Sequence, residues 1–526
     1  MPSHGTGPEG SMHRLSPLDS MFLLLERRHT PFHVGALNLF RPPEGSPPDF
    51  AARLAERLRQ SASAGPPFNR CLTGSIRTGF WGQDPNFELS HHFVHLALPK
   101  PGSFSDLQAM VSRLHSALLD RSYPLWRTYL IEGLEDGRIA TYSKIHHSMV
   151  DGVAGIRLML KSMSPDRLAS LEMPPPWAMK PSRERSHMSV PAVAGFRALV
   201  DLAKQGRHLV PAVYNQIKQV VMDYRAQHPD LVTSFQAPRC IFNQPVSASR
   251  QFAAKSYSTA RIKAVGASLD GTVNDVALAL CSAALRRYLV EKNALPDEPL
   301  IAAVPVSIRR DDGDEGNEVA AALINLATHR DDPIERFNLI KASMDYNKER
   351  FQQMSPAQVL AYTAAMLTPG VLTFLPGVKH TVANVVISNV PGPREPMYWQ
   401  GCLLEGTYPA SLLLDGFALN ITLISRHDAI DFGFLACRRA VPQMQQLLNY
   451  IEDALVELES ATLKYSAPAL IGAHRASSAA QAARFKRVAT NLSDQRIQLS
   501  ARVPDVAIPE LTPAAKKNPP DQGRTR

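Results

Sequence analysis

"TYSKIHHSMVDGVAG", residues 141–155, places two adjacent histidines between a strand-like segment and a helix-like one. The residues "GRIATYSKIHH" alternate in polarity as a half-buried strand does, and "GVAGIRLMLKSM" has the periodicity of a helix. The stretch therefore predicts a strand, a tight turn made with Gly152, and a helix. This unit indicates an α/β fold that holds His146 and His147 at the end of a strand.

A histidine at the end of a strand is well placed for general-base catalysis. Neutral imidazole has an unperturbed pKa of about 6.5, so it can accept a proton near neutral pH. Asp151 lies four residues after His147, where it can pair with a distant arginine or contact the imidazole directly. A structural histidine and a metal site are the alternatives, although the second lacks a third nearby ligand. No GxSxG elbow occurs in the chain, which argues against a serine hydrolase of that type.

The composition indicates a folded protein of more than one domain. Of the 526 residues, 44% are apolar and 20% are charged, and this length exceeds one ordinary core. The five cysteines form no CxxC pair, which predicts a reducing compartment and no zinc site. The net charge of +9 favours anionic partners. Because no basic run is interleaved with aromatic residues, we expect phosphate-bearing substrates or lipid headgroups, and no nucleic acid.

Two segments bear on a membrane location. The tract "VLAYTAAMLTPGVLTFLPGV" (359–378) is as long as a membrane span, but two Pro-Gly pairs break it into shorter buried or surface-lying pieces. A helical stretch at 191–226 carries basic residues among apolar ones, which fits either a crossover helix or an amphipathic helix on a membrane. The first 14 residues lack a signal-peptide pattern. We therefore expect a cytoplasmic protein.

Composition and periodicity divide the chain into two α/β blocks with extensions. A helix is expected at "TVNDVALALCSAALRRYLVEK" and a hairpin at "FALNITLISRHDAIDFGFLACRR", both in the second block. The expected segments are a disordered N-terminus (1–13), a first α/β domain with the histidine pair (14–163), a proline-rich connector with a crossover helix (164–239), a second α/β domain (240–463) and a basic disordered tail (464–526).

"HHSMVDG" resembles the HHxxxDG motif of the bacterial wax ester synthase/diacylglycerol acyltransferases, within the wider CoA-dependent acyltransferase superfamily. Peptide-synthetase condensation domains share this motif, so it does not decide the family. Further stretches within residues 14–463 resemble segments of the wax ester synthase family and follow one another in the same order as in that family. They include "LSPLDSMFLLLE", "PFHVGALNLF", "DRSYPLWRTYLIEGLEDGRIATYSKIHH", "TVNDVALA", "VPVSIR" and "SNVPGP". The resemblance implies a two-domain chloramphenicol-acetyltransferase-like fold with the active-site channel between the domains.

The resemblance also implies an activity. The chain is expected to be an acyl-CoA-dependent O-acyltransferase that esterifies diacylglycerol, a long-chain fatty alcohol or both, giving triacylglycerol or wax ester. His147 would act as the general base in a direct transfer, without an acyl-enzyme. Acyl-CoA would be a co-substrate, with no cofactor and no metal. These lipid substrates imply peripheral contact of the protein with the inner face of the membrane or with lipid inclusions.

The resemblance assigns supporting roles to four residues around the base. His146 and Gly152 match motif positions that are expected to be architectural. Asp151 matches the motif acid, whose role is structural, and Arg309 of "VPVSIR" is its expected partner. These residues would hold the turn that presents His147.

Three further residues are expected along the channel. Asn274 of "TVNDV" could contact the carbonyl or the acceptor, but it could equally cap the helix that follows. Asp275 beside it and Trp126 of the PLW element are placed in the substrate channel, and Trp126 could either contact the acyl chain or pack beneath the active site. Two departures from the family pattern stand out: Ser148 replaces the usual alanine, and the stretch 424–439 differs from the expected SYxGxLxFGLxAD.

Two other functions remain open on the sequence. A condensation-type acyltransferase with a carrier-bound donor is disfavoured by the PLW, NDV and SNVPGP elements and by the lack of an attached carrier domain. A weakly active paralogue that binds lipid droplets is disfavoured by the intact His147 and Asp151.

Overall fold

The computed structural model describes residues 12–60, 63–76, 79–150, 152–179, 232, 236–307, 319–354, 358–359, 362–363 and 380–464. The expected helix at 191–226 and most of the apolar tract 359–378 lie outside these residues. The chain divides into one compact unit, Met1–Thr462, and the segment Leu463–Arg526. None of the helices within the described ranges has the length and apolar character that crossing a bilayer requires.

A first six-stranded sheet carries the histidine motif at the end of an interior strand, β7. The order is β14–β15–β2–β7–β6–β5, and all neighbours are antiparallel except β5 and β6. Strand β7, which pairs with β6, confirms the predicted strand that ends in the histidine pair. In sheet order the strands are Tyr398–Trp399, Cys402–Ala410, His33–Arg41, Ile139–His146, Trp126–Glu132 and Phe93–Ala97.

A second six-stranded sheet has the order β11–β10–β13–β16–β17–β9. Strand β13 is parallel to both of its neighbours, and the other pairs are antiparallel. The pair β16–β17 confirms the predicted hairpin, and β17 is buried along its whole length. In sheet order the strands are Val319–Asn325, Ile301–Ser307, Val385–Pro391, Leu419–Ser425, Ala429–Cys437 and Arg250–Ser258.

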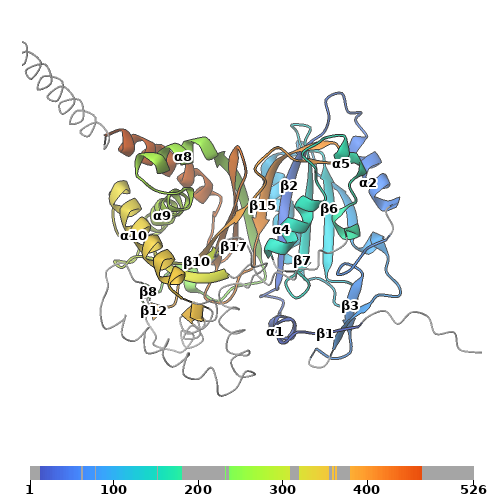
Figure 1. The fold of residues 1–526 in the computed structure, drawn as a ribbon, viewed down its shortest axis with the longest axis horizontal. Coiled ribbons are helices and arrows are strands. Elements are labelled where there is room, and N and C mark those ends of the chain that lie inside the picture. Colours follow the sequence, from blue (N-terminus) through green and yellow to red (C-terminus); the bar gives the residue numbers. More distant parts are fainter. Residues whose placement is uncertain are drawn as a thin grey trace, which may run out of the picture. The chain divides into compact units, whose positions relative to one another are not determined.

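Strand β15 connects the two sheets. It follows β13 in the sequence but pairs with β2, where Ala410 lies opposite Gly35. It also contacts β16 and β17 of the second sheet. Figure 1 shows β15 between the two sheets. Two strands from the predicted second domain, β14 and β15, therefore belong to the first sheet, and the domain boundaries stay a prediction.

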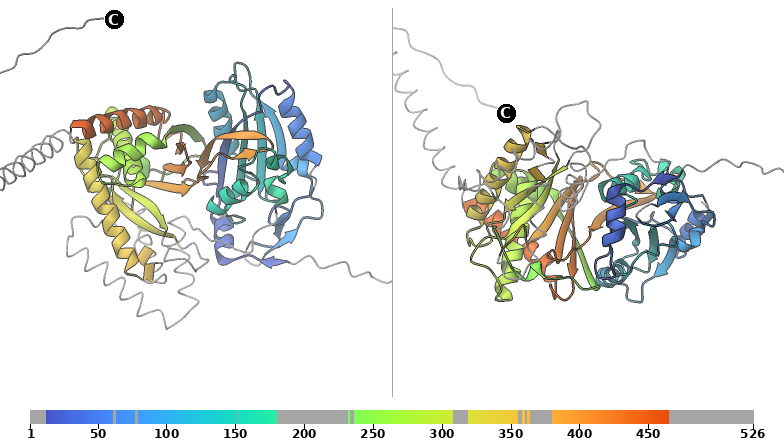
Figure 2. Two further views of the ribbon diagram at one scale, coloured as in Figure 1. Left: turned by 45° about the horizontal axis from the view of Figure 1, so that its top comes forward. Right: turned by 90° about the horizontal axis from the view of Figure 1, so that it is seen from below.

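Helices cover the sheets. Figures 1 and 2 show α8, α9 and α10 together on the second sheet, while α4 lies next to β2 of the first. The α-helices are α1 (Pro17–Leu25), α2 (Phe50–Gln60), α3 (Phe104–Ser116), α4 (Gly152–Lys161), α5 (Ala169–Glu172), α8 (Thr259–Ser268), α9 (Val273–Glu291), α10 (Pro333–Gln352) and a last helix that starts at residue 446.

Shorter elements complete the described part. A three-stranded sheet has the order β1–β4–β3, and β12 pairs with β8. The strands are His13–Arg14, Phe80–Gln83, Arg70–Thr73, His380–Thr381 and Ala237–Pro238, and the 3-10 helices are Leu89–His91, Pro176–Ala178 and Ile241–Asn243.

The start of α9 corrects one expectation. The N-cap is Thr272, whose hydroxyl accepts a hydrogen bond from the main-chain N–H of Asp275 while the Asp275 carboxylate accepts from the main chain of Thr272. Both bonds satisfy donors that a helix start leaves free. Asn274 lies inside the first turn, so the prediction that it caps the helix is wrong.

Candidate active site

The alternation of β7 divides its side chains between two environments. Successive side chains of a strand point to opposite faces. Ser143 and Ile145, followed by His147 just beyond the strand, line a cavity. On the other face, Lys144 donates from Nζ to the carbonyl oxygens of Leu114 and Ala117 at the end of α3, at 2.8 and 2.6 Å. Burial lowers the pKa of Lys144 to about 7.

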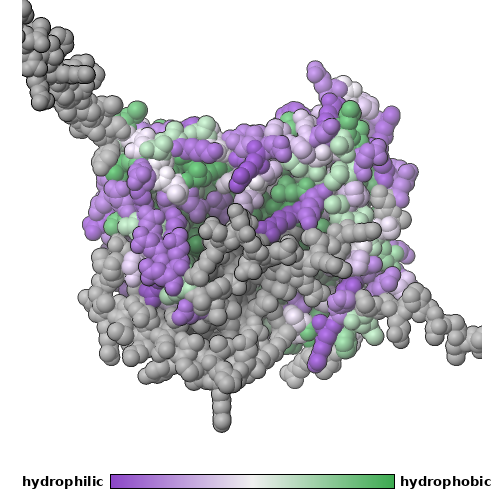
Figure 3. All heavy atoms as spheres, viewed as in Figure 1, coloured by the Kyte–Doolittle hydropathy of each residue, from purple (hydrophilic) through white to green (hydrophobic). Residues whose placement is uncertain are grey.

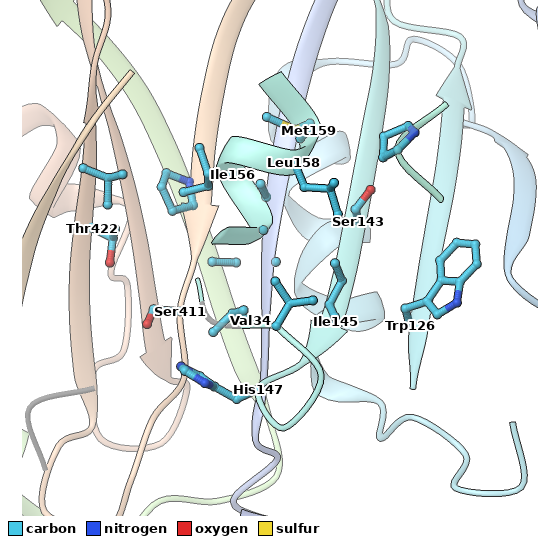
Figure 4. A pocket seen from close by; sticks show the side chains of 18 of the residues that line it. Val34, Trp126, Ser143, Ile145, His147, Ile156, Leu158, Met159, Ser411 and Thr422 are labelled. Atoms are coloured by element: carbon cyan, nitrogen blue, oxygen red, sulfur yellow. The ribbon is translucent and has the colours of Figure 1, made fainter. Parts of the chain in front are cut away.

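The cavity lies between the two sheets and has a volume of about 140 Å³. Most of its lining is apolar, and His147 is the one titratable residue among the described residues that line it. Figure 4 shows His147 at one end, with α4 above and Trp126 to the side. Figure 3 shows apolar side chains gathered in a hollow near β2 and β15, framed by hydrophilic ones. A largely apolar cavity with few polar groups is typical of a small-molecule site.

The imidazole of His147 is buried and neutral at physiological pH. Burial lowers its pKa to about 4, a hydrogen bond to its own main chain opposes that shift, and the charge of His146 adds to it. The ring packs against Phe22 of α1, with 4.9 Å between the ring centroids. The main-chain N–H of His147 donates to the carbonyl oxygen of Phe32, at 2.8 Å. A neutral imidazole held in this way and facing a cavity can accept a proton from a bound molecule.

A buried carboxylate, Glu26, fixes the turn that carries His147. Its Oε1 accepts from the main-chain N–H of Phe32 at 3.1 Å, and its Oε2 accepts from the Arg121 guanidinium at 3.0 Å. Burial raises the pKa of Glu26, but His146, Phe32 and Arg121 together lower it to about 2. Because Phe32 in turn holds the main chain of His147, the ionised carboxylate clamps the start of β2 to the end of β7.

His146, the neighbour of His147, faces this carboxylate. Its Nε2 lies 3.3 Å from Glu26 Oε1, close enough for a charge interaction but without the alignment of a hydrogen bond. The hydroxyl of Ser148 lies 2.6 Å from Nδ1 of His146, and the main-chain N–H of Ser148 donates to the same nitrogen at 3.2 Å. Nδ1 of His146 therefore accepts hydrogen bonds from Ser148, so the ring proton of His146 is on Nε2, which faces Glu26. Ser148, the departure from the family's alanine, thus fixes the tautomer of His146.

Trp126 lines the cavity and is itself rigidly held. Its Nε1–H donates to the carbonyl oxygen of Phe68 at 2.7 Å, and its ring stacks with Trp177 at a centroid distance of 5.8 Å. Phe68, Trp177 and Met159 line the same part of the cavity. Trp126 therefore both packs in the core and contacts whatever fills the cavity.

Asn274 and Asp275 are not among the residues that line the cavity. Asn274 Oδ1 accepts from the amide of Asn389 at 2.9 Å, and Asn389 Oδ1 accepts from the hydroxyl of Ser425 at 3.0 Å. Ser388, the neighbour of Asn389 on β13, does line the cavity. Asn274 is thus connected to the cavity wall through β13, and the channel roles of Asn274 and Asp275 stay predictions.

Asp151 and Arg309 lie outside the described residues, so their pairing stays a prediction. Gly152 is the first residue of α4, after the turn at residues 147–149, and its architectural role stays a prediction. No group of three or more potential metal ligands occurs within the described ranges.

Sequence reasoning missed two parts of the site. Glu26 follows a run of leucines in "FLLLERR", where nothing marks it as buried or as a partner of His146. Ser411 lines the cavity from the end of β15, and its position depends on a pairing with β2 far away in the sequence. The alternation of β7 could have placed Ser143 and Ile145 beside His147.

Comparisons with known proteins agree with this geometry. The model of the wax ester synthase/diacylglycerol acyltransferase catalytic domain matches residues 15–277, and that of the family's C-terminal domain matches 315–459. An O-acyltransferase WSD from Acinetobacter baylyi is 45% identical over 86% of this chain and 98% of its own length. A probable diacylglycerol O-acyltransferase, tgs2, from Mycobacterium tuberculosis is 42% identical over 86% and 99%.

Solved structures extend the comparison to the fold. The wax ester synthase/diacylglycerol acyltransferase from Marinobacter aquaeolei superposes with a TM-score of 0.71 at 39% identity, covering 86% of this chain and all of that one. A condensation domain of the calcium-dependent antibiotic synthetase has a TM-score of 0.51 at 13% identity, covering 86% and 96%, and shares the fold alone. These matches confirm the expected two-domain chloramphenicol-acetyltransferase-like fold. The chain belongs to the wax ester synthase/diacylglycerol acyltransferase family and is an O-acyltransferase.

Proposed function

We propose that this O-acyltransferase transfers an acyl group from acyl-CoA to the hydroxyl of a long-chain alcohol or a diacylglycerol, with His147 as the general base. The main observation that supports this proposal is the cavity between the sheets, in which His147 is the one titratable residue of the described lining. Burial keeps its imidazole neutral, with a pKa of about 4. A neutral base in an apolar cavity suits the deprotonation of a hydroxyl group on a long hydrocarbon chain.

The transfer needs one base and no covalent intermediate. His147 takes the proton of the acceptor hydroxyl as that oxygen attacks the thioester carbonyl carbon. The new carbon–oxygen bond forms, the carbon–sulfur bond breaks, and the departing thiolate of CoA takes the proton back from the imidazolium. The clamp formed by Glu26, Phe32 and Arg121 keeps the imidazole in place through both steps.

The apolar lining supports a long hydrocarbon chain in the substrate. Ile156, Leu158 and Met159 of α4 form one wall, and Trp126 and Trp177 form another. Burying one methylene group contributes about 0.8 kcal/mol, so each extra contact along these walls favours a longer chain. The same walls exclude water, which would otherwise compete with the alcohol for the thioester.

The activity is tested by measuring release of CoA from palmitoyl-CoA with hexadecanol or with diolein as the acceptor. We expect release that depends on the acceptor, ester as the product, and a loss of at least about 100-fold in His147→Ala, since general-base catalysis contributes roughly 100- to 10,000-fold. Normal ester formation by His147→Ala would refute the base. The ratio of rates with the two acceptors identifies the preferred product, wax ester or triacylglycerol.

We also propose that α1 contacts a lipid surface. Leu24 and Leu25 are each 51% exposed, and the exposed Arg27 and Arg28 follow them. Exposed leucines beside cations suit the interface of an anionic membrane or droplet. Phe22 of the same helix touches His147, so this contact would bring the site close to its substrates. We expect a Leu24→Ser, Leu25→Ser variant to sediment less with vesicles containing phosphatidylglycerol; unchanged sedimentation would contradict the contact.

A further inference from the structure

Ser411 occupies a defined position beside the base. In the first sheet, Ala410 pairs with Gly35, Val34 pairs with Ile145, and Ile145 pairs with Trp126. Continuing the register of β15 by one residue places Ser411 beside Val34. Figure 4 shows Ser411, Val34, Ile145 and Trp126 in one row, with His147 next to it. Paired residues of antiparallel strands point to the same face, so the side chain of Ser411 faces the cavity that it lines.

The spacing of the strands leaves room for a reacting group between Ser411 and His147. Neighbouring strands lie about 4.8 Å apart, so the backbones of β15 and β7 are separated by about 10 Å, with β2 between them. Val34 lies between them on β2, and its side chain lines the same cavity. Ser411 and His147 therefore face one cavity from either side of Val34, and a thioester carbonyl bound in that cavity can be reached from both.

The hydroxyl of Ser411 is free to bind a ligand. Among the polar side chains of the lining, Thr128 pairs with Ser143 at 2.9 Å, and Thr422 pairs with Asn420 at 2.8 Å. The hydroxyls of Ser411 and Ser388 make no hydrogen bond with any of the described residues. An unpaired hydroxyl in a largely apolar cavity indicates a group that binds substrate.

The main chain of Ser411 is held from behind by a buried histidine. His115 donates from Nε2 to the carbonyl oxygen of Ser411 at 3.1 Å, and its Nδ1 accepts from the hydroxyl of Tyr142 at 2.6 Å. Burial lowers the pKa of His115 to about 3, so the ring stays neutral and this tautomer persists. Pro409, two residues earlier, packs against Gly433 of β17. The serine is therefore pre-organised, as a transition-state donor must be.

We propose that Ser411 is a second catalytic residue, whose hydroxyl donates a hydrogen bond to the carbonyl oxygen of the thioester as that oxygen becomes negative. The inference rests on the proposed function, because it presumes the attack of an alcohol that has lost its proton to His147. Ser411 keeps its proton and forms no covalent bond. Its hydrogen bond strengthens as the tetrahedral centre forms and weakens when the thiolate leaves.

The test compares steady-state kinetics of Ser411→Ala, Ser411→Thr and His147→Ala with palmitoyl-CoA and the better acceptor. Losing an oxyanion donor costs about 100- to 1,000-fold in kcat. We expect Ser411→Ala to lose at least about 30-fold in kcat while KM for both substrates changes less than threefold, because the bond forms only in the transition state. Ser411→Thr keeps the hydroxyl and should retain kcat within about tenfold.

Two outcomes would overturn the assignment. A normal kcat in Ser411→Ala would do so, and so would a raised acceptor KM at normal kcat, because either means that the hydroxyl is not used in the transition state. Ser388→Ala, which removes another hydroxyl of the lining on β13, is the matched comparison; an equal loss of kcat there would attribute the effect to the general polarity of the cavity. Activity in His147→Ala would instead refute the proposed function, so the two failures are distinguishable.

Discussion

At the scale of single residues, the site depends on one imidazole whose proton affinity is set by burial. The pKa of His147 is lowered to about 4 because a dry environment disfavours the charged ring. The base is consequently in its neutral form over the whole physiological range. As the proposed base, His147 is weaker than an exposed histidine, and we expect positioning and the proposed hydrogen bond from Ser411 to offset this.

The pH profile of kcat/KM tests this environment. Since the folded-state pKa is depressed, the neutral imidazole persists above it and is lost only as the pH falls towards about 4. We expect kcat/KM to be flat from about pH 8 to about pH 5.5 and then to fall with a single-proton limb. A limb centred near the ordinary histidine pKa would show that the ring is solvated. The stability of the enzyme at each pH must be checked by activity after return to neutral pH.

Glu26 is expected to matter more for catalysis than for binding. Glu26→Gln keeps the shape of the side chain but removes the charge that faces His146 and Arg121. Because the clamp on the turn loosens, we expect kcat to fall by about tenfold, and losing the charge on the bond to Arg121, which keeps its bond to the carbonyl oxygen of Leu23, should cost about 1–3 kcal/mol of stability. The readouts are kcat, KM and the melting temperature.

The control for Glu26 is Asp19→Asn on the same helix. Asp19 completes the capping box of α1 and is separate from the turn that carries His147. Asn keeps an acceptor oxygen but loses the negative charge near the helix N-terminus, so the melting temperature should fall slightly, at a cost of about 0.3–1 kcal/mol, while kcat of the folded enzyme stays normal. If Glu26→Gln behaved in the same way, Glu26 would be a purely structural residue.

At the scale of elements, we expect α4 to set the length of the chain that the cavity accepts. Met159 lines the cavity near Trp126 and Trp177. We expect Met159→Phe to shorten the preferred acyl chain, because excluding three or four methylene groups forfeits about 3 kcal/mol, or roughly 100-fold in kcat/KM. The measurement is the ratio of kcat/KM for palmitoyl-CoA to that for decanoyl-CoA.

The control for this prediction is Met159→Leu, a swap that nearly conserves volume and should leave the ratio within about threefold of the wild type. An unchanged ratio in Met159→Phe would place the acyl chain elsewhere. Lowered activity with both donors, without a change of the ratio, would indicate damage to packing and would equally contradict the proposed location.

Local periodicity of the sequence predicted individual helices and strands well, but it did not predict which strands pair in the sheets. The alternation in "GRIATYSKIHH" and the helical period after Gly152 are properties of neighbouring residues, so β7 and α4 followed directly from the sequence. The cap of α9 required a choice between Thr272 and Asn274, which both cap well, and the structure selects Thr272. The place of β15 beside β2 depends on contacts between strands more than 350 residues apart, which no local pattern contains.

At the scale of the whole molecule, the site exists because one strand serves both sheets. β15 pairs with β2, passes against β17 and ends at Ala410, directly before Ser411. The base comes from the first sheet, while Ser388 and Thr422 of the lining come from the second. The distance between these walls is therefore fixed by the packing of β15 on β17.

Gly433 of β17 is the closest point of that packing. A Cβ built there would lie 2.0 Å from the carbonyl oxygen of Pro409, a backbone atom that cannot rotate away. This glycine belongs to the stretch 424–439 that departs from the family pattern. Because β17 is buried along its whole length, the strand has little freedom to retreat from the clash.

We therefore expect Gly433→Ala to push β15 away from β17 and to displace Ser411, which follows Pro409 by two residues. Overpacking of this kind costs about 1–3 kcal/mol, and kcat should fall together with the melting temperature. Gly65→Ala is the matched control, because its nearest atom would lie 3.7 Å away and no strain results. If Gly433→Ala had the same melting temperature and the same kcat as Gly65→Ala, the contact between β15 and β17 would not set the geometry of the site.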